Sequence, residues 1–210
     1  IFDAGKIFNI SEKKLKYDYK GSLEFSKKYK VYGFDINKTR IDELKKGYDS
    51  SLEVSLEELK ECSNLQLTDD PKLLDHPEIY IITVPTPVDS SNKPNLQPLI
   101  SASEIVGNFI KKNNIVIYES TVFPGATEEI CVPILEKYSS LKFNSDFFCG
   151  YSPERINPGD TEHRLTTITK VTSGSTSDAA AWIDCFYGSI ICRSRLNLPN
   201  YRPVAAQVLS

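Results

Sequence analysis

Residues 78–84 read Glu-Ile-Tyr-Ile-Ile-Thr-Val, a nearly continuous apolar run of strand length. A strand that is apolar on both faces is typical of a parallel sheet that is covered by helices on each side. Pro85 and Pro87 follow the run and end it, because proline has no backbone N–H to donate to a neighbouring strand. This stretch therefore predicts a buried central strand of a parallel sheet.

Similar runs alternate with helical patterns along the rest of the chain. Further strands are predicted at 30–36, 65–68, 114–119, 143–150 and 168–172. Helices are predicted after Asn37 and at 55–62, 96–112, 126–138 and 176–186. Strands that alternate with helices in this way imply βαβ units. We therefore predict an α/β protein with a doubly wound, mainly parallel sheet and helices on both faces.

The composition limits the classes of function. A net charge of −3 over 210 residues gives no basic surface for nucleic acid, and no apolar run approaches the length of a membrane-spanning helix. The five cysteines form no CxxC pair and the two histidines stand apart from them, so no metal site is expected. Scattered cysteines are typical of reduced thiols in a cytoplasmic protein. Since the chain starts with isoleucine and has no methionine, we expect a fragment.

Asp35 is the first candidate site residue, because it lies at the end of the strand predicted at 30–36. In dinucleotide-binding folds an acidic residue at the end of the second strand binds the adenine ribose and selects NAD over NADP. Alternatively, Asp35 only supports Asn37, which is placed to cap the next helix. The residues alone leave both interpretations open.

The glycine-rich turn that normally accompanies such an acidic residue is missing. A Gly-x-Gly-x-x-Gly turn should lie about 20 residues earlier, where it lets the backbone approach the cofactor pyrophosphate. Residues 14–22 instead read Lys-Leu-Lys-Tyr-Asp-Tyr-Lys-Gly-Ser, in which Gly21 is the one glycine. We expect the pyrophosphate cradle to be broken.

Two other strand ends carry candidate residues. Val84, Pro85 and Thr86 leave one strand at its carboxyl end, where open α/β sheets bind ligands, and can wall a pocket. Ser120 and Thr121 leave the next strand, and their hydroxyls can contact a ligand or cap the following helix. On the residues alone, capping is the favoured interpretation of the two hydroxyls.

A third segment reads Gly150-Tyr-Ser-Pro-Glu-Arg-Ile-Asn-Pro-Gly-Asp160. Taken alone, it fits a surface loop with an ion pair between Glu154 and Arg155. His163 and Arg164 follow closely and can order this loop or contact an anion.

Segments at 33–37, 119–126 and 150–165 together resemble, in the same order, the UDP-glucose/GDP-mannose dehydrogenase family. Within it the chain is most similar to the bacterial UDP-N-acetylhexosamine 6-dehydrogenases. The resemblance extends from about Leu23 to Ile191 and weakens at both ends.

This resemblance implies a division into three parts. Residues 23–191 are expected to form a Rossmann-like NAD-binding domain. Residues 1–22 are an atypical segment without the glycine loop. Residues 192–210 are a diverged start of the family's central helix region, irregular over 192–203, and the substrate domain is absent.

The resemblance also implies an activity. The family oxidises the C6 hydroxyl of a UDP-sugar with NAD, here a UDP-N-acetylhexosamine, to a uronic acid for surface polysaccharides. Such enzymes are expected to be cytoplasmic and homo-oligomeric at full length. Two alternatives remain open: a non-catalytic Rossmann-like module that binds a nucleotide or nucleotide-sugar, and an inactive truncated product.

Roles for individual residues follow from the same resemblance. The expected cofactor contacts are Asp35, Arg40, Val84, Pro85, Thr86, Ser120 and Thr121. The expected catalytic residues are Thr121, which positions a water or oxyanion, and Glu154, the general base or water activator. The expected substrate contacts are Glu154, Arg155, Ile156 and Asn157.

Two departures from the family weaken the expectation of activity. The family's cysteine nucleophile lies in the second domain, so the five cysteines here are expected to be structural. Gln207 stands where the family places a catalytic lysine, and a neutral amide cannot stabilise a developing alkoxide in the same way.

Overall fold

The computed structural model describes residues 6–11, 18–49, 55–88, 93–153, 170–191 and 196–198. The strands are β1 (Lys6–Ser11), β2 (Lys30–Asp35), β3 (Leu65–Thr68), β4 (Ile79–Ile82), β5 (Ile115–Tyr118), β6 (Phe148–Tyr151), β7 (Val171–Gly174) and β8 (Leu196–Leu198). The helices are α1 (Asp18–Ser26), α2 (Lys38–Lys45), α3 (Leu56–Glu61), α4 (Gln97–Gly107), α5 (Val132–Ser139) and α6 (Ser177–Gly188). A 3-10 helix, η1 (Pro71–Asp75), precedes β4, and a π-helical turn, η2 (Thr127–Cys131), leads into α5.

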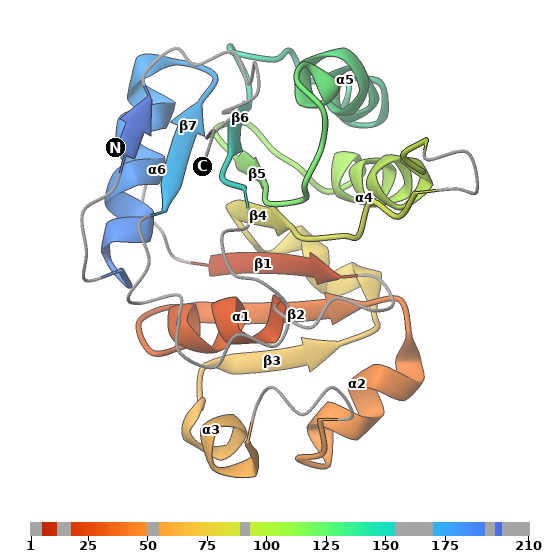
Figure 1. Cartoon of the computed structure of the whole chain (residues 1–210), viewed down its shortest axis with the longest axis vertical. Coiled ribbons are helices and arrows are strands. Elements are labelled where there is room, and N and C mark those ends of the chain that lie inside the picture. The colour runs from red at the N-terminus through yellow and green to blue at the C-terminus, as the bar shows by residue number, and fades with distance from the viewer. Residues whose placement is uncertain are drawn as a thin grey trace.

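The strands of the described residues form one sheet in the order β3-β2-β1-β4-β5-β6-β7-β8 (Figure 1). Every neighbouring pair is parallel except β6 and β7, which are antiparallel. The direction of winding reverses between β1 and β4, and open α/β sheets bind ligands beyond the strand ends at such a switch point. The predicted doubly wound, mainly parallel sheet is confirmed.

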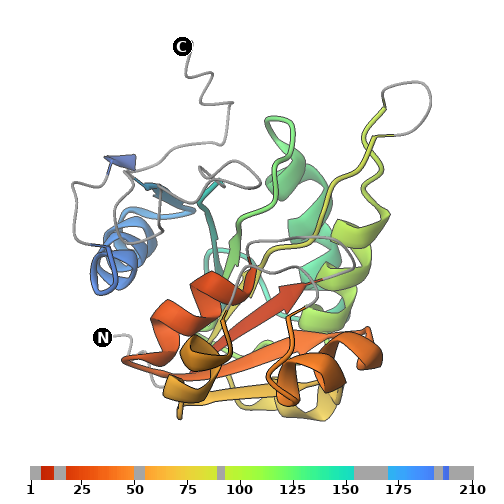
Figure 2. The same ribbon diagram turned by 60° about the horizontal axis from the view of Figure 1, so that its bottom comes forward.

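Helices cover both faces of the sheet, and β4 shows why. Tyr80 and Ile82 belong to the core cluster under α4 and α5, whereas Ile79 and Ile81 belong to the cluster under α1 and α6. Figure 2 shows the two pairs of helices on opposite sides of the strands. All four side chains of β4 are buried, as expected from the apolar run at 78–84.

Two glycines allow α6 to lie close to the sheet. Gly150 in β6 and Gly174 in β7 are paired across the antiparallel ladder. A Cβ atom added to Gly150 would lie 2.4 Å from Ile183 Cδ1, and one added to Gly174 would lie 2.3 Å from the Ala180 backbone nitrogen. Real Cβ atoms do not approach other atoms so closely, so this packing requires glycine at both positions.

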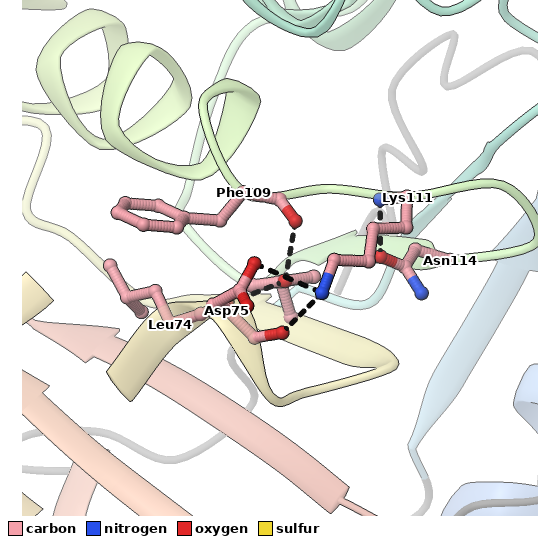
Figure 3. Close-up of polar contacts among 6 residues, drawn as sticks. Leu74, Asp75, Phe109, Lys111 and Asn114 are labelled. Carbon is pink, nitrogen blue, oxygen red and sulfur yellow. Dashed lines mark hydrogen bonds and ion pairs between the residues drawn. The ribbon is translucent and has the colours of Figure 1, made fainter. Parts of the chain in front are cut away.

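Polar contacts at the amino edge of the sheet involve Leu74, Asp75, Phe109, Lys111 and Asn114 (Figure 3). The Tyr80 hydroxyl donates to the Leu74 carbonyl oxygen at 2.8 Å and lies 3.3 Å from the Phe109 carbonyl oxygen. Beside them, Lys111 Nζ lies 2.9 Å from Asp75 Oδ1. These contacts join the segments that lead into β4 and β5, at the edge opposite the candidate site residues.

Two strands lie in segments for which the sequence predicted none. β1 lies within the atypical segment 1–22, yet it pairs with β2 and β4 at the centre of the sheet. β8 lies within 192–203, so the prediction that this stretch is irregular was wrong for Leu196–Leu198. This strand pairs with β7 and covers what would otherwise be an open edge.

Candidate functional site

The carboxyl ends of the parallel strands bring several candidate residues to one edge of the sheet. Asp35 is the last residue of β2 and is in register with Ser11, the last residue of β1. Ile82, at the end of β4, is in register with Tyr118, at the end of β5. The residues that follow β4 and β5 therefore leave the sheet at the same edge as Asp35.

Asp35 is 3% exposed and is bound to the start of α2. Its Oδ1 accepts a hydrogen bond from the Asn37 N–H at 2.7 Å. Asn37 in turn caps α2, because its Oδ1 accepts from the Arg40 N–H at 3.4 Å. The structure therefore shows the supporting role of Asp35, while its position at the end of β2 is the one that a ribose-binding carboxylate occupies.

The Arg40 side chain is bound by carboxylates of its own chain. One guanidinium nitrogen bonds to Asp49 Oδ1, and the other lies 3.7 Å from Glu43 Oε2. The Asp49 side chain is 2% exposed and that of Arg40 is 13% exposed. The guanidinium that the resemblance assigns to the cofactor is thus neutralised by a buried acidic residue, and its contact with ribose stays a prediction.

The segments that leave β4 and β5 are joined by two hydrogen bonds, which we call the β4–β5 brace. The Thr86 hydroxyl donates to the Thr121 carbonyl oxygen at 2.5 Å. The Ser120 hydroxyl donates to the Val84 carbonyl oxygen at 2.6 Å. Ser120 therefore does not cap the next helix, as the residues alone had favoured, and the predicted pocket wall is one connected unit.

A buried polar cluster that the sequence did not predict lies at the same edge. Lys170 precedes β7, and its ammonium lies 3.3 Å from Oε1 of Glu119, which follows β5. Tyr187 of α6 donates its hydroxyl to the same carboxylate oxygen, and its ring lies 5.4 Å from Lys170 Nζ. Burial, and then the Glu119 charge, raise the pKa of Tyr187 well above its usual value.

One sequence signal could have identified this cluster. Lys170 lies within the strand predicted at 168–172, between Ile168 and Val171. A lysine in a strand with two covered faces needs a partner, because an unpaired charge is too costly to bury. The sequence does not show which carboxylate that partner is.

The described residues fit one end of a dinucleotide. Asp35 stands beside the switch point, where an adenine ribose binds in such sheets. β1 ends at Ser11 and α1 begins at Asp18, and residues 12–17 between them read Glu-Lys-Lys-Leu-Lys-Tyr. Since this segment contains no glycine, it lacks the residue type that lets a backbone approach the pyrophosphate closely.

The remaining predicted residues, Glu154, Arg155, Ile156 and Asn157, lie outside the described residues, as do His163, Arg164 and Gln207. Within the described ranges, no group of three or more His, Cys, Asp or Glu side chains could hold a metal ion. The same ranges contain no helix whose length and apolar character would let it span a bilayer.

Comparison with known proteins agrees with this architecture. Residues 22–191 match the family model described as the NAD binding domain of the UDP-glucose/GDP-mannose dehydrogenase family. The chain is 58% identical over 170 residues to a UDP-N-acetyl-D-glucosamine 6-dehydrogenase of Pseudomonas aeruginosa, a match that covers 81% of this chain and 40% of that protein. A protein of the same name from Salmonella typhi is 54% identical over the same shares of both chains.

A solved structure gives the same result for the fold. The UDP-D-ManNAc dehydrogenase of Pyrococcus horikoshii superposes with a TM-score of 0.82 at 26% identity, over 94% of this chain and 47% of that one. The chain spans about 40% of the length of the curated relatives that it matches. The matched residues, 22–191, agree with the limits of the resemblance, Leu23 and Ile191. The chain therefore belongs to the UDP-glucose/GDP-mannose dehydrogenase family and carries that family's NAD-binding domain.

Proposed function

We propose that this chain is the NAD-binding part of a dehydrogenase that oxidises the C6 hydroxyl of a UDP-N-acetylhexosamine to the uronic acid. The observation that carries the proposal is the placement of Asp35 and the β4–β5 brace at the carboxyl edge of a sheet that matches this family. The relatives at 58% and 54% identity, both named UDP-N-acetyl-D-glucosamine 6-dehydrogenase, support the substrate class.

In this proposal NAD would supply the oxidising power: two NAD molecules in turn would each accept one hydride from C6, and a water would supply the second oxygen of the carboxylate. The residues of the chain would bind and orient the cofactor and the sugar. Asp35 accepts hydrogen bonds from the adenine ribose hydroxyls, and the β4–β5 brace walls the nicotinamide side. Thr121 positions a water or oxyanion, and Glu154 acts as general base. Burial raises the pKa of a carboxylate and so makes it a stronger base near neutral pH. Arg155, Ile156 and Asn157 line the sugar site.

The proposal extends to the setting of the enzyme. Cys62, Cys131 and Cys149 are buried free thiols, which supports a reducing compartment such as the cytoplasm. We also propose a homo-oligomeric enzyme at full length and a role of its product in surface polysaccharides, both from the family relationship.

A second candidate is a non-catalytic module that keeps only nucleotide affinity. The sequence between β1 and α1 favours this second candidate, because a segment without glycine lacks the residue type that lets a backbone approach the pyrophosphate. The adenosine end is then the main source of affinity. AMP would then bind as tightly as NAD.

Calorimetric titration of the purified chain with AMP, NAD and UDP-N-acetylglucosamine tests both candidates. AMP should bind, and D35A should weaken it about tenfold or more, since hydrogen bonds to a charged group contribute about 1.5–3 kcal/mol. NAD that binds more tightly than AMP favours the dehydrogenase, and AMP that binds as tightly as NAD favours the module. A chain that does not bind AMP, or a D35A variant with unchanged affinity, rules out the adenosine site.

A further inference from the structure

Arg40 and the proposed ribose-binding residue Asp35 belong to one hydrogen-bonded unit at the start of α2. The Asp35 carboxylate accepts from the Asn37 N–H at 2.7 Å, and the Asn37 side chain accepts from the Arg40 N–H at 3.4 Å. The Arg40 backbone is thus fixed in the first turn of α2, shortly after the end of β2. A cation in this turn stands near the place that the 2′ position of a bound adenosine would occupy.

Such a cation has a known consequence for cofactor choice. In dinucleotide-binding folds an arginine near the end of the second strand accommodates the 2′-phosphate of NADP. A guanidinium suits phosphate because its planar fork gives two parallel charge-assisted hydrogen bonds. Taken alone, Arg40 would therefore favour the phosphorylated cofactor and oppose Asp35.

We propose that Asp49 is a specificity-determining residue, because its buried carboxylate binds the Arg40 guanidinium and neutralises the charge that would attract a 2′-phosphate. This inference rests on the proposed NAD-binding function. Discrimination against NADP then has two parts: Asp35 repels the phosphate, and Asp49 neutralises the cation that would attract it. The Asp49 side chain is 2% exposed and bonds directly to an Arg40 nitrogen.

The other charged groups near Arg40 are less suited to this role. Glu43 lies 3.7 Å from the guanidinium, and its side chain is 34% exposed, so solvent and salt screen it. Lys38 is another cation of α2, but its side chain is 75% exposed and lies 3.9 Å from Asp69. Asp49 is therefore the carboxylate whose charge controls Arg40, and Glu43 provides a matched control.

The test compares AMP with adenosine 2′,5′-bisphosphate, two ligands that need only the adenosine end of the site. D35S removes the repelling carboxylate. In that background, D49N should tighten the bisphosphate about tenfold or more, because the asparagine oxygen still accepts from Arg40 while the positive charge is no longer neutralised. AMP affinity should change less than about threefold, since AMP carries no 2′-phosphate.

Two controls separate this role from a structural one. D35S/E43Q removes a carboxylate of the same charge, and its bisphosphate affinity should stay within about threefold of D35S because that carboxylate is screened. Adding R40M to D35S/D49N should abolish the gain. Thermal melting verifies that each variant is folded, and D49S replaces D49N if the latter does not fold.

The outcomes distinguish the two proposals. A bisphosphate affinity that is equal in D35S and D35S/D49N, with AMP still bound, overturns the role of Asp49 and leaves the adenosine site intact. A gain that survives R40M also overturns it. Failure of the unsubstituted chain to bind AMP removes both the proposed function and this inference.

Discussion

Lys170 Nζ lies 3.3 Å from Glu119 Oε1, and this ion pair joins the start of β7 to the end of β5 across the strand that lies between them, β6. The Lys170 side chain is 2% exposed and that of Glu119 is 20% exposed. Ser120 and Thr121, which follow Glu119 directly, provide one side of the β4–β5 brace. The Lys170–Glu119 ion pair therefore helps to fix the backbone that carries these two residues.

K170M is expected to destabilise the chain by about 3–5 kcal/mol, because it leaves the Glu119 carboxylate without its cation. The double variant E119Q/K170M should recover most of this loss, since neither buried charge is then unpaired. Urea unfolding measures the effect through the fluorescence of Trp182, the one tryptophan of the chain, which stacks on Phe186 of α6.

K111M serves as the control for that experiment. Lys111 forms an ion pair with Asp75 at the amino edge, where both side chains are more than half exposed (Figure 3). Exposed pairs contribute about 0–1 kcal/mol, so K111M should have little effect. Equal losses in K170M and K111M would contradict the importance of the buried pair.

Stability should fall steeply at alkaline pH. Burial raises the pKa of Cys131 to about 11 and holds that of Tyr187 well above its usual value. In unfolded chains these groups lose their protons near pH 8.5 and 10 respectively. Above those values the unfolded state binds fewer protons than the native state, so each group lowers the free energy of unfolding by about 1.4 kcal/mol per pH unit.

The contribution of Tyr187 can be isolated by substitution. Y187F should unfold more readily at pH 7, because the hydroxyl that binds Glu119 is lost. Above pH 10 its stability should fall less steeply than that of the unsubstituted chain, by about 1.4 kcal/mol per unit. Urea titrations from pH 7 to 11 measure both slopes, and parallel slopes would refute the assignment.

Restoring glycines between β1 and α1 should improve NAD binding selectively. E12G/K14G/Y17G places glycine at the first, third and sixth positions of the turn. NAD should bind about tenfold tighter or more, because backbone N–H groups gain access to the charged pyrophosphate, while AMP gains less. E12A/K14A/Y17A removes the same side chains without adding glycine, and an equal gain in that variant would show that bulk alone was limiting.

The chain alone should form little or no NADH with UDP-N-acetylglucosamine. It lacks the glycine turn, and it spans about 40% of the length of its relatives. The resemblance predicts that Gln207 replaces a catalytic lysine, which would add a third loss, and one missing transition-state donor costs about 10²–10³ in rate. Absorbance at 340 nm follows the reaction, and steady NADH production would prove this expectation wrong.

The sequence predicted the parts of the fold where the apolar pattern is strong. β4 lies within the predicted run at 78–84, and Asn37 caps α2 as expected. β1 was missed because Asn9 interrupts a short apolar stretch, and only pairing with β2 and β4 reveals the strand. The strand predicted at 143–150 begins later, at Phe148, and residues 144–146 form a turn in which Asn144 has a positive φ.

The candidate site was predicted less completely than the fold. Asp35 and the residues of the β4–β5 brace were predicted as site residues because each lies at or just after a strand end that the apolar pattern marks. The sequence cannot show that Arg40 is bound to Asp49, or that Lys170 reaches Glu119, because these pairs depend on how distant segments pack. A lysine in a buried strand indicates that a carboxylate partner exists, but the sequence does not show which carboxylate it is.

The facing glycines of β6 and β7 make the candidate site sensitive to a change made well away from it. Gly150 and Gly174 leave no space for even a methyl group beneath α6. A side chain at Gly174 is expected to displace α6, because the added Cβ would meet the backbone of Ala179 and Ala180. That displacement would move the Tyr187 hydroxyl, which binds Glu119 at the end of β5. The position of the end of β5 therefore depends on two residues of β6 and β7 that carry no side chain.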